Sequence, residues 1–196
     1  LRPANLAYMI YISGLTGMPK GVEGSHAGML SRFLWMWQKF PFTSDDVCCA
    51  KTSLNFVDSI WELLGGLLEG VPTVVADGAT ARDPGALLRL IGDHGVTRLI
   101  VVPALATALI EEASRVGGGL ESLRFLTFSG EPLTSDLAYQ ARALNANMTV
   151  LNLYGASETA ADATFCVVGD ADLEGAKVPI GSPIWNTRLY VLDASL

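Results

Sequence analysis

The chain has 196 residues, half of them hydrophobic, and a formal net charge of −7. This length is enough to bury a core without disulfide bonds or metal ions. The excess of acidic side chains argues against a long nucleic acid as partner, because a phosphate binder needs a basic stripe. The apolar runs have the length of strands and fall far below the roughly 20 residues of a membrane span. The composition therefore predicts a cytoplasmic protein that binds neither nucleic acid nor membrane.

Apolar segments alternate with amphipathic segments along the whole chain. Strands are predicted at Leu6–Ile12, Val47–Lys51, Thr73–Ala76, Arg98–Val102, Arg124–Phe128, Thr149–Leu153 and Arg188–Leu192. Helices are predicted at His26–Lys39, Val57–Glu69, Pro84–His94, Ala104–Arg115 and Ser135–Leu144. The strand segments are rich in Val, Ile and Leu, which is typical of parallel strands covered on both faces. The pattern predicts an α/β fold with a doubly wound, mostly parallel sheet, followed by a β-rich piece where the helices stop.

The cysteines Cys48, Cys49 and Cys166 are three in number and show no metal-ligand spacing. We expect them to be buried thiols of a protein from a reducing compartment.

The first chemical signal is a glycine-rich loop, Ser13–Gly21, that follows the first predicted strand. Its glycines let backbone N–H groups approach an anion. Ser13 and Thr16 add hydroxyl donors, and Lys20 adds a cation. The order of residues differs from the usual P-loop, in which the lysine is followed by Ser or Thr. The loop alone therefore leaves two interpretations open, a phosphate-binding loop or a plain turn from strand to helix.

Four segments, in order, resemble the motifs of the adenylate-forming superfamily, which includes nonribosomal peptide synthetase adenylation domains, acyl-CoA synthetases and luciferases. They are Tyr11–Val22, Phe56–Ser59, Gly130–Pro132 and Asn152–Glu158. The first resembles Tyr-Thr-Ser-Gly-Ser/Thr-Thr-Gly-x-Pro-Lys-Gly and departs from it at Ile12 and Leu15. The hydroxyl that is missing at Leu15 implies one phosphate donor fewer and weaker use of ATP. Four motifs in order are more specific than any one of them, and they imply the three-layer αβα core of that superfamily.

The resemblance implies an ATP site, at which a carboxylate attacks the α-phosphate and releases pyrophosphate. Tyr154 would stack on adenine, Asn152 would hydrogen-bond its edge, and Ser157 would donate to the α-phosphate. Glu158 would hold Mg²⁺, a hard cation that prefers oxygen ligands. The implied nucleotide-binding set is Ser13, Gly14, Thr16, Gly17, Lys20, Gly130, Glu131, Pro132, Asn152, Tyr154, Gly155 and Ser157. The implied catalytic set is Thr16, Lys20, Ser157 and Glu158. Without the resemblance, Tyr154 belongs to a strand-ending turn and Glu158 is an exposed carboxylate.

The resemblance also implies a domain organisation. Residues 1–45 would carry the phosphate loop, residues 46–165 would form a flavodoxin-like α/β subdomain with the acid and adenine sites, and residues 166–196 would begin a β-rich subdomain. The chain starts without Met and stops soon after a predicted strand, so we expect it to be a fragment. The ribose-binding Asp, the hinge and the C-terminal lid subdomain with its catalytic Lys would lie downstream, and the fragment alone is predicted to be inactive. A carrier-protein domain bearing phosphopantetheine is the implied partner of the parent, with an MbtH-like helper protein as a further one.

The superfamily reads its acid at fixed offsets from these motifs. The positions here are Val57, Asp58, Trp61, Val101, Thr127, Ser129, Leu153, Ala161 and Asp162. In members that take α-amino acids, an Asp directly follows the Phe, whereas here Val57 holds that place and the carboxylate lies one residue later, at Asp58. A β-amino acid carries its ammonium one methylene further from its carboxyl group, and the string resembles the family's pattern for β-alanine, departing mainly at Thr127. Asp162 would be a second carboxylate beside the ammonium. Alternatively, Asp58 is one of the acids that favour a first helical turn, and Asp162 is an ordinary loop residue.

Two other functions stay open beside an amino-acid-activating enzyme. An acyl- or aryl-CoA synthetase shares the motifs, but a fatty or aromatic acid offers no cation to pair with Asp58 and Asp162. The other is a non-catalytic nucleotide-binding remnant. His26 and His94 have no nucleophile or carboxylate partner at a recognisable offset, so we expect both to be structural.

Overall fold

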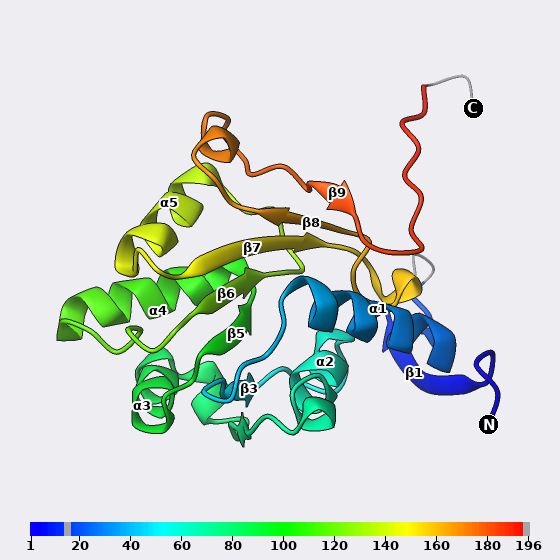
Figure 1. Ribbon diagram of the computed structural model, residues 1–196, viewed down its shortest axis with the longest axis horizontal. Coiled ribbons are helices and arrows are strands. Elements are labelled where there is room, and N and C mark those ends of the chain that lie inside the picture. Colours follow the sequence, from blue (N-terminus) through cyan, green and yellow to red (C-terminus); the bar gives the residue numbers. More distant parts are fainter. Residues whose placement is uncertain (14–16, 194–196) are drawn as a thin grey trace.

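The computed structural model describes residues 1–13 and 17–193 (Figure 1). These residues form a seven-stranded sheet in the order β4-β3-β5-β6-β7-β8-β9 and a separate two-stranded sheet, β1-β2. The strands are β1 (Leu6–Ile12), β2 (Lys20–Ser25), β3 (Cys48–Ala50), β4 (Thr73–Val75), β5 (Arg98–Val101), β6 (Phe125–Phe128), β7 (Thr149–Tyr154), β8 (Thr164–Val167) and β9 (Ser182–Pro183). The α-helices are α1 (His26–Lys39), α2 (Asp58–Leu64), α3 (Pro84–His94), α4 (Pro103–Val116) and α5 (Ser135–Leu144). The short 3₁₀ helices are η1 (Leu67–Glu69), η2 (Thr80–Arg82), η3 (Ser157–Thr159) and η4 (Ala171–Leu173).

The main sheet is mostly parallel and is covered on both faces. Strands β4, β3, β5, β6 and β7 run parallel, and β8 and β9 extend the sheet in the antiparallel sense. Helices α3, α4 and α5 cover one face, whereas α1 and α2 cover the other (Figure 1). The predicted three-layer α/β fold is confirmed.

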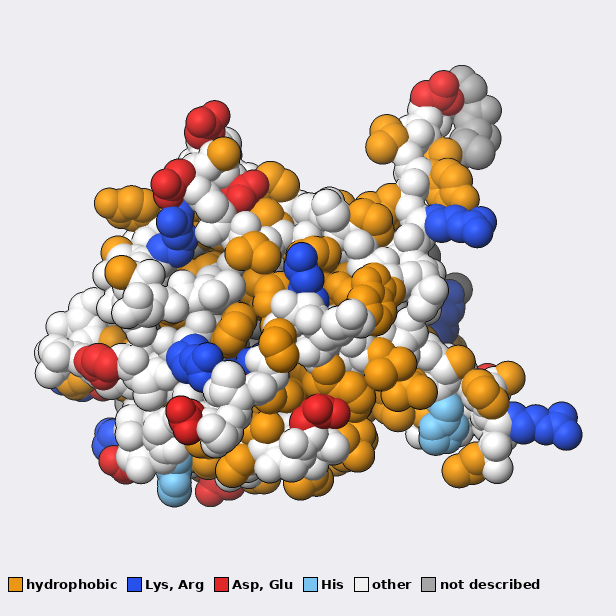
Figure 2. Space-filling view, in the orientation of Figure 1, with side chains coloured by type: hydrophobic (Ala, Val, Ile, Leu, Met, Phe, Trp, Pro, Cys, Tyr) orange, Lys and Arg blue, Asp and Glu red, His pale blue; other side chains and the backbone are white. Residues whose placement is uncertain are grey.

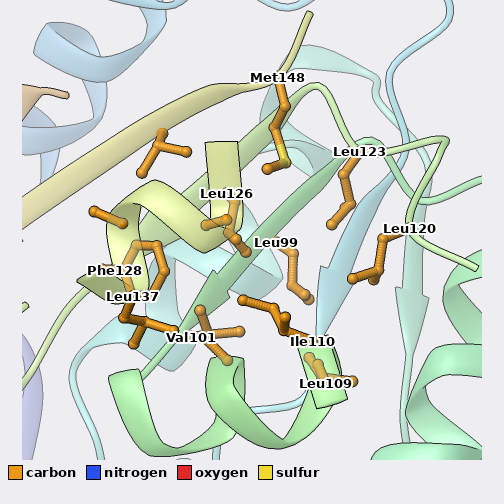
Figure 3. Close-up of a cluster of buried hydrophobic side chains, with 14 of the residues drawn as sticks. Leu99, Val101, Leu109, Ile110, Leu120, Leu123, Leu126, Phe128, Leu137 and Met148 are labelled. Carbon is orange, nitrogen blue, oxygen red and sulfur yellow. The ribbon is translucent and has the colours of Figure 1, made fainter. Parts of the chain in front are cut away.

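The two faces of the sheet have different cores. On the first face, hydrophobic side chains of β5 and β6 such as Leu99, Val101 and Phe128 pack against α4 and α5 (Figure 3). On the second face the core is rich in aromatic rings, with Phe33 and Trp35 of α1 beside Trp61 of α2. Because strands β5 and β6 are buried on both sides, their sequences are mostly apolar.

Helices α1, α3 and α5 have the predicted bounds because each begins at a capping side chain. Ser25 accepts a hydrogen bond from the backbone nitrogen of Gly28 at 3.1 Å, and Asp83 and Thr134 cap α3 and α5 in the same way. The predicted helix Val57–Glu69 instead divides into α2 and η1, which are separated by two glycines.

One predicted strand, Leu6–Ile12, is confirmed but has an unexpected place in the fold, and another prediction was wrong. Strand β1 lies outside the main sheet and pairs antiparallel with β2, a glycine-containing strand that the sequence pattern did not indicate. The segment Arg188–Leu192 forms no strand, and its hydrophobic side chains are exposed, because no neighbouring strand among the described residues pairs with it. Beyond β7 the short antiparallel strands β8 and β9 follow, as expected for a β-rich piece; the proposed subdomain bounds stay a prediction.

The surface agrees with the composition. Figure 2 shows the basic side chains of this face dispersed among acidic and neutral ones, without a continuous basic stripe. Among the described residues no helix is long and apolar enough to cross a bilayer. All three cysteines are buried and unpaired, as predicted, and burial raises the pKa of the Cys49 thiol to about 12.

Candidate functional site

The turn after β7 is held in one conformation by close packing. Its first residue, Gly155, has no room for a side chain, because an added Cβ would overlap the carbonyl oxygen of Ala161. Ala160 and Ala161 both have positive φ angles, 57° and 85°, a left-handed conformation that is costly for residues other than glycine. Strain at two adjacent residues persists only where the surroundings fix it, so the turn is a rigid platform. Tyr154, the last residue of β7, leaves 53% of its surface exposed beside this turn, which keeps its ring available for stacking.

A cavity of about 490 Å³ separates the β1-β2 hairpin from helix η3. Ser157 and Glu158 line it from η3, and Glu23 and Ser25 line it from the hairpin strand β2. The structure therefore brings the predicted Asn152–Glu158 motif to the hairpin whose connecting segment is the predicted phosphate loop. The motif follows the carboxyl end of β7, and the carboxyl ends of parallel strands form the edge at which open α/β sheets bind ligands.

The phosphate loop is described only in part. Gly14 and Thr16 lie outside the described residues. Ser13, Gly17 and Lys20 are exposed on either side of them, and Gly17 has a φ of 80°. At the nucleotide-side turn after β6, Gly130, Glu131 and Pro132 are all exposed.

The side chains that line this cavity suit a metal ion that arrives bound to phosphate. The described residues contain no group of three or more His, Cys, Asp or Glu side chains that could hold a metal by themselves. Glu158 offers one exposed carboxylate to the cavity. Mg²⁺ is usually held by one or two carboxylates together with substrate phosphates and water, and Glu158 fits that pattern.

Several of the residues predicted to bind the acid lie where α2 meets the end of β6. Asp58, in the first turn of α2, accepts a hydrogen bond from the hydroxyl of Ser129, with an Oγ–Oδ2 distance of 3.0 Å. Trp61 lies one helical turn further and is buried in the aromatic core with Leu153. Thr127 is buried two residues before Ser129, on the same face of β6. Asp58 and Ser129 are 71 residues apart in sequence, and the fold brings them into contact.

The register of the sheet places one predicted pocket residue, Val101, on the face opposite Thr127. In the parallel sheet Ile100 pairs with Thr127, whereas Val101 pairs with Phe128. Val101 is buried in the core between the sheet and α4 (Figure 3), and it does not join the other predicted residues. Ile100 lies in the aromatic core with Trp61. Val101 thus lies on the opposite face of the sheet from Thr127, because successive side chains of a strand alternate between faces, and its role toward the substrate stays a prediction.

Asn152 also lies on the face opposite the acid pocket. It pairs with Phe128 in the sheet, and its side chain is buried. Its amide nitrogen donates to the carbonyl oxygen of Pro179 at 2.9 Å. This side chain ties β7 to the segment before β9, and its role toward adenine stays a prediction.

Trp61 is locked in place from several sides. Its ring stacks on Phe42, with ring centroids 6.1 Å apart and an interplanar angle of 12°. An added Cβ at Gly65 would lie 2.5 Å from the ring, so glycine is needed there. The carbonyl oxygen of Gly65 in turn accepts a hydrogen bond from Trp37 Nε1 at 2.7 Å. The tryptophan therefore forms a fixed wall of the pocket.

Comparison with known proteins identifies the family. The family model for AMP-binding enzymes matches residues 1–196, the whole chain. The chain belongs to the AMP-binding enzyme family.

Relatives of this AMP-binding chain are large synthetases. Vanchrobactin synthetase VabF of Vibrio anguillarum is 41% identical over 204 residues, which are 100% of this chain and 7% of the relative. The beta-alanyl-bioamine nonribosomal peptide synthetase ebony of Drosophila melanogaster is 36% identical over 203 residues, 97% of this chain and 23% of the relative. Among solved structures, the AMPPNP-bound form of the nonribosomal peptide synthetase FmoA3 superposes with a TM-score of 0.91 at 30% identity, covering 98% of this chain and 20% of that protein. The chain thus spans a minor part of these proteins.

In this AMP-binding chain Asp162 has a partner that sequence reasoning missed. Arg32 of α1 donates from Nε to Asp162 Oδ2 at 2.7 Å, and both side chains are almost fully buried. Burial raises the pKa of Asp162 from 3.8 to about 6; the Arg32 charge opposes this rise, and the Asp58 charge adds to it. The partners are 130 residues apart, so no local pattern pointed to the pair.

Glu62 is a second residue that the sequence reasoning missed, and it positions the start of α2. Its buried carboxylate accepts hydrogen bonds from the backbone nitrogens of Lys51 (2.9 Å) and Thr52 (2.7 Å). It also accepts from Thr52 Oγ1 at 2.8 Å and from Lys51 Nζ at 3.3 Å. These bonds hold the segment between β3 and α2 on which Asp58 depends. The available signal was an acidic residue on an apolar helix, four residues after Asp58.

Proposed function

We propose that this chain is the central part of an adenylation domain of a nonribosomal peptide synthetase, which activates an amino acid as its acyl-AMP with release of pyrophosphate. One observation carries the proposal. The Ser157–Glu158 helix and the hairpin of the phosphate loop face each other across one cavity at the carboxyl edge of the sheet. Asp58, the carboxylate assigned here to the amino acid, lies where the start of α2 meets the end of β6. An ATP site beside an acid site is what acyl-AMP formation needs.

In this proposal the chain positions two anions that repel each other. The ring of Tyr154 stacks on adenine, and the hydroxyl of Ser157 donates to the α-phosphate. Lys20 and the backbone of the loop bind the outgoing phosphates. Glu158 binds Mg²⁺, which when bound neutralises phosphate charge. These donors stabilise the charge that develops as the carboxylate attacks phosphorus.

The proposed substrate is β-alanine or a related small β-amino acid. Asp58 is the carboxylate that pairs with the ammonium group, and its contact with Ser129 orients it. Because this carboxylate follows Val57 instead of the preceding Phe56, it suits an ammonium placed one methylene further from the reacting carboxyl group. Trp61 limits the length of the pocket, which favours a small acid. The name of the ebony relative, a beta-alanyl-bioamine synthetase, supports this substrate class.

The product would pass to a neighbouring carrier-protein domain. The phosphopantetheine thiol of such a domain accepts the acyl group from the acyl-AMP, and an MbtH-like helper protein would act on the same enzyme. These partners are part of the proposal for the intact protein, of which this chain spans a part.

The test is acid-dependent ATP–pyrophosphate exchange by the intact enzyme. Three acids of matched size are compared: β-alanine, L-alanine and propionate. We expect exchange with β-alanine to exceed exchange with L-alanine at least about tenfold, because the ammonium of L-alanine falls short of Asp58. Propionate has no cation and should be a poor substrate. Preferred exchange with propionate or a longer fatty acid would contradict the amino-acid site, and preferred exchange with L-alanine would contradict the β-amino-acid assignment.

A further inference from the structure

Arg32 is a buried cation next to the acid pocket, on a helix that supplies none of the predicted pocket residues. Its side chain is 3% exposed, and that of Asp162 is 0% exposed. The Nη2 and Nε atoms lie 2.5 Å and 2.7 Å from the same carboxylate oxygen, Oδ2. The guanidinium carbon lies 4.4 Å from the centroid of the Trp61 ring. Arg32 thus contacts two of the predicted pocket residues directly.

A small cavity shows how close Arg32 is to the rest of the pocket. This cavity of about 10 Å³ is lined by Tyr8 and Arg32 together with the pocket residues Val57, Trp61 and Ala161. Nη1 and Nη2 of Arg32, and Oδ1 of Asp162, are buried and make no hydrogen bond among the described residues. The positive charge of Arg32 therefore lies at the pocket wall with its hydrogen-bonding capacity only partly used.

The charges of the site decide what each carboxylate can do. Asp58 and Asp162 carry two negative charges, and Arg32 carries one positive charge. Arg32 contacts only Oδ2 of Asp162, and an ammonium placed at the unbonded Oδ1 would meet a carboxylate that Arg32 already neutralises and would be repelled by the guanidinium. Asp58 has no such partner cation among the ion pairs of the described residues, and the Ser129 hydroxyl that donates to it is neutral.

We propose that Arg32 is a specificity-determining residue, which neutralises Asp162 and leaves Asp58 as the single carboxylate that binds the substrate ammonium. This inference rests on the proposed function, since it needs an amino acid in this pocket. It restricts the substrate class to acids that bring one positive charge to the pocket. A diamino acid, such as 2,3-diaminopropionate, would bring a second ammonium that no free carboxylate compensates.

A pair of variants separates this role from direct binding by Asp162. Asp162→Asn leaves the Arg32 charge uncompensated beside the pocket, because arginine does not lose its proton. The double variant Arg32→Met with Asp162→Asn removes both charges and retains a long side chain over Trp61. If Asp162 serves only to neutralise Arg32, adding Arg32→Met to Asp162→Asn should restore binding of the amino acid. If Asp162 itself binds the ammonium, the double variant stays as poor as the single one.

The experiment measures pyrophosphate exchange by the intact enzyme with whichever amino acid the wild type activates best. Asp162→Asn should raise the KM for the amino acid at least about tenfold. The double variant should recover a KM for the amino acid within about threefold of the wild type. No recovery in a double variant that still binds ATP would overturn the proposal, as would an unchanged KM in Asp162→Asn.

A matched control accounts for the loss of a buried ion pair as such. Asp46 pairs with Arg98 at 2.9 Å, and its side chain is also fully buried. Asp46→Asn should lower the temperature of unfolding without raising the KM for the amino acid. If the wild type activates an acid without an ammonium group, the proposed function fails. The comparison of the single and double variants tests Arg32 separately, with any amino acid that is a substrate.

Discussion

Replacing Asp58 with Asn removes one negative charge from the acid pocket and keeps the shape of the side chain. The Asn side-chain oxygen can still accept the hydrogen bond that Ser129 donates at 3.0 Å, so the local structure should persist. What is lost is the ion pair with the substrate ammonium. Truncating one partner of a buried charge pair costs about 2–5 kcal/mol, and because Asp58 is only half-buried we expect the lower end. The expected loss in kcat/KM for β-alanine is then about 30-fold.

The assay is pyrophosphate exchange by the intact enzyme, with β-alanine and L-alanine for each variant. The KM for ATP is the internal control, because Asp58 is not part of the nucleotide site. The paired variant Val57→Asp with Asp58→Ala moves the carboxylate back by one residue and should shift preference toward L-alanine. An Asp58→Asn enzyme that activates β-alanine as well as the wild type would refute the reasoning, and Asp58 would then be an ordinary acid of a first helical turn.

Three further predictions concern the framework of the site. Gly155→Ala should destabilise the intact enzyme's adenylation domain by at least about 2 kcal/mol, because the new Cβ overlaps the Ala161 carbonyl. Denaturant unfolding measures this change, and an unchanged unfolding midpoint would show that the turn can shift. Glu62→Gln should lower the free energy of unfolding by about 3 kcal/mol and raise the KM for the amino acid, because it breaks the buried ion pair with Lys51. The control is Glu112→Gln, which removes a partner from an exposed ion pair and should change neither quantity. Folding raises the pKa of Asp162 from 3.8 to about 6, so the native state holds this proton more tightly than the unfolded state does. The contribution of Asp162 to the free energy of unfolding should therefore fall as the pH rises from about 4 to about 6. The difference in unfolding free energy between wild type and Asp162→Asn across this range measures that dependence, and a flat difference would contradict the shift.

The sequence predicted most of the fold because local signals decide it. Ser25, Asp83 and Thr134 mark helix starts that agree with the structure, since a capping side chain acts on the residues directly after it. Strand β2 escaped prediction because its glycines give little β propensity, and only its pairing with β1 makes it a strand.

The site was harder to predict than the fold because two of its features depend on tertiary structure. The choice between Val101 and Ile100 depends on which side chain of β5 shares a face with Thr127, and only the register of the sheet gives that. Arg32 was missed because a cation on an amphipathic helix is usually solvated, and here its partner comes from a turn 130 residues later. Asp58 was identified as a pocket residue from a motif, and its contact with Ser129 agrees with that position.

The contact between Gly65 and Trp61 links two positions that evolution can change only in a certain order. While the tryptophan is present, any side chain at position 65 meets its ring at 2.5 Å, so mutations at Gly65 should be purged. A smaller residue at position 61 would remove the clash with the ring and leave only the carbonyl oxygen of residue 61, 2.7 Å from an added Cβ, as an obstacle to alanine or serine at position 65. Once such a residue is fixed, return to tryptophan would be blocked by the new Cβ. Lineages that enlarged this pocket to admit longer acids should therefore have lost the glycine afterwards, and the change of substrate would be difficult to reverse.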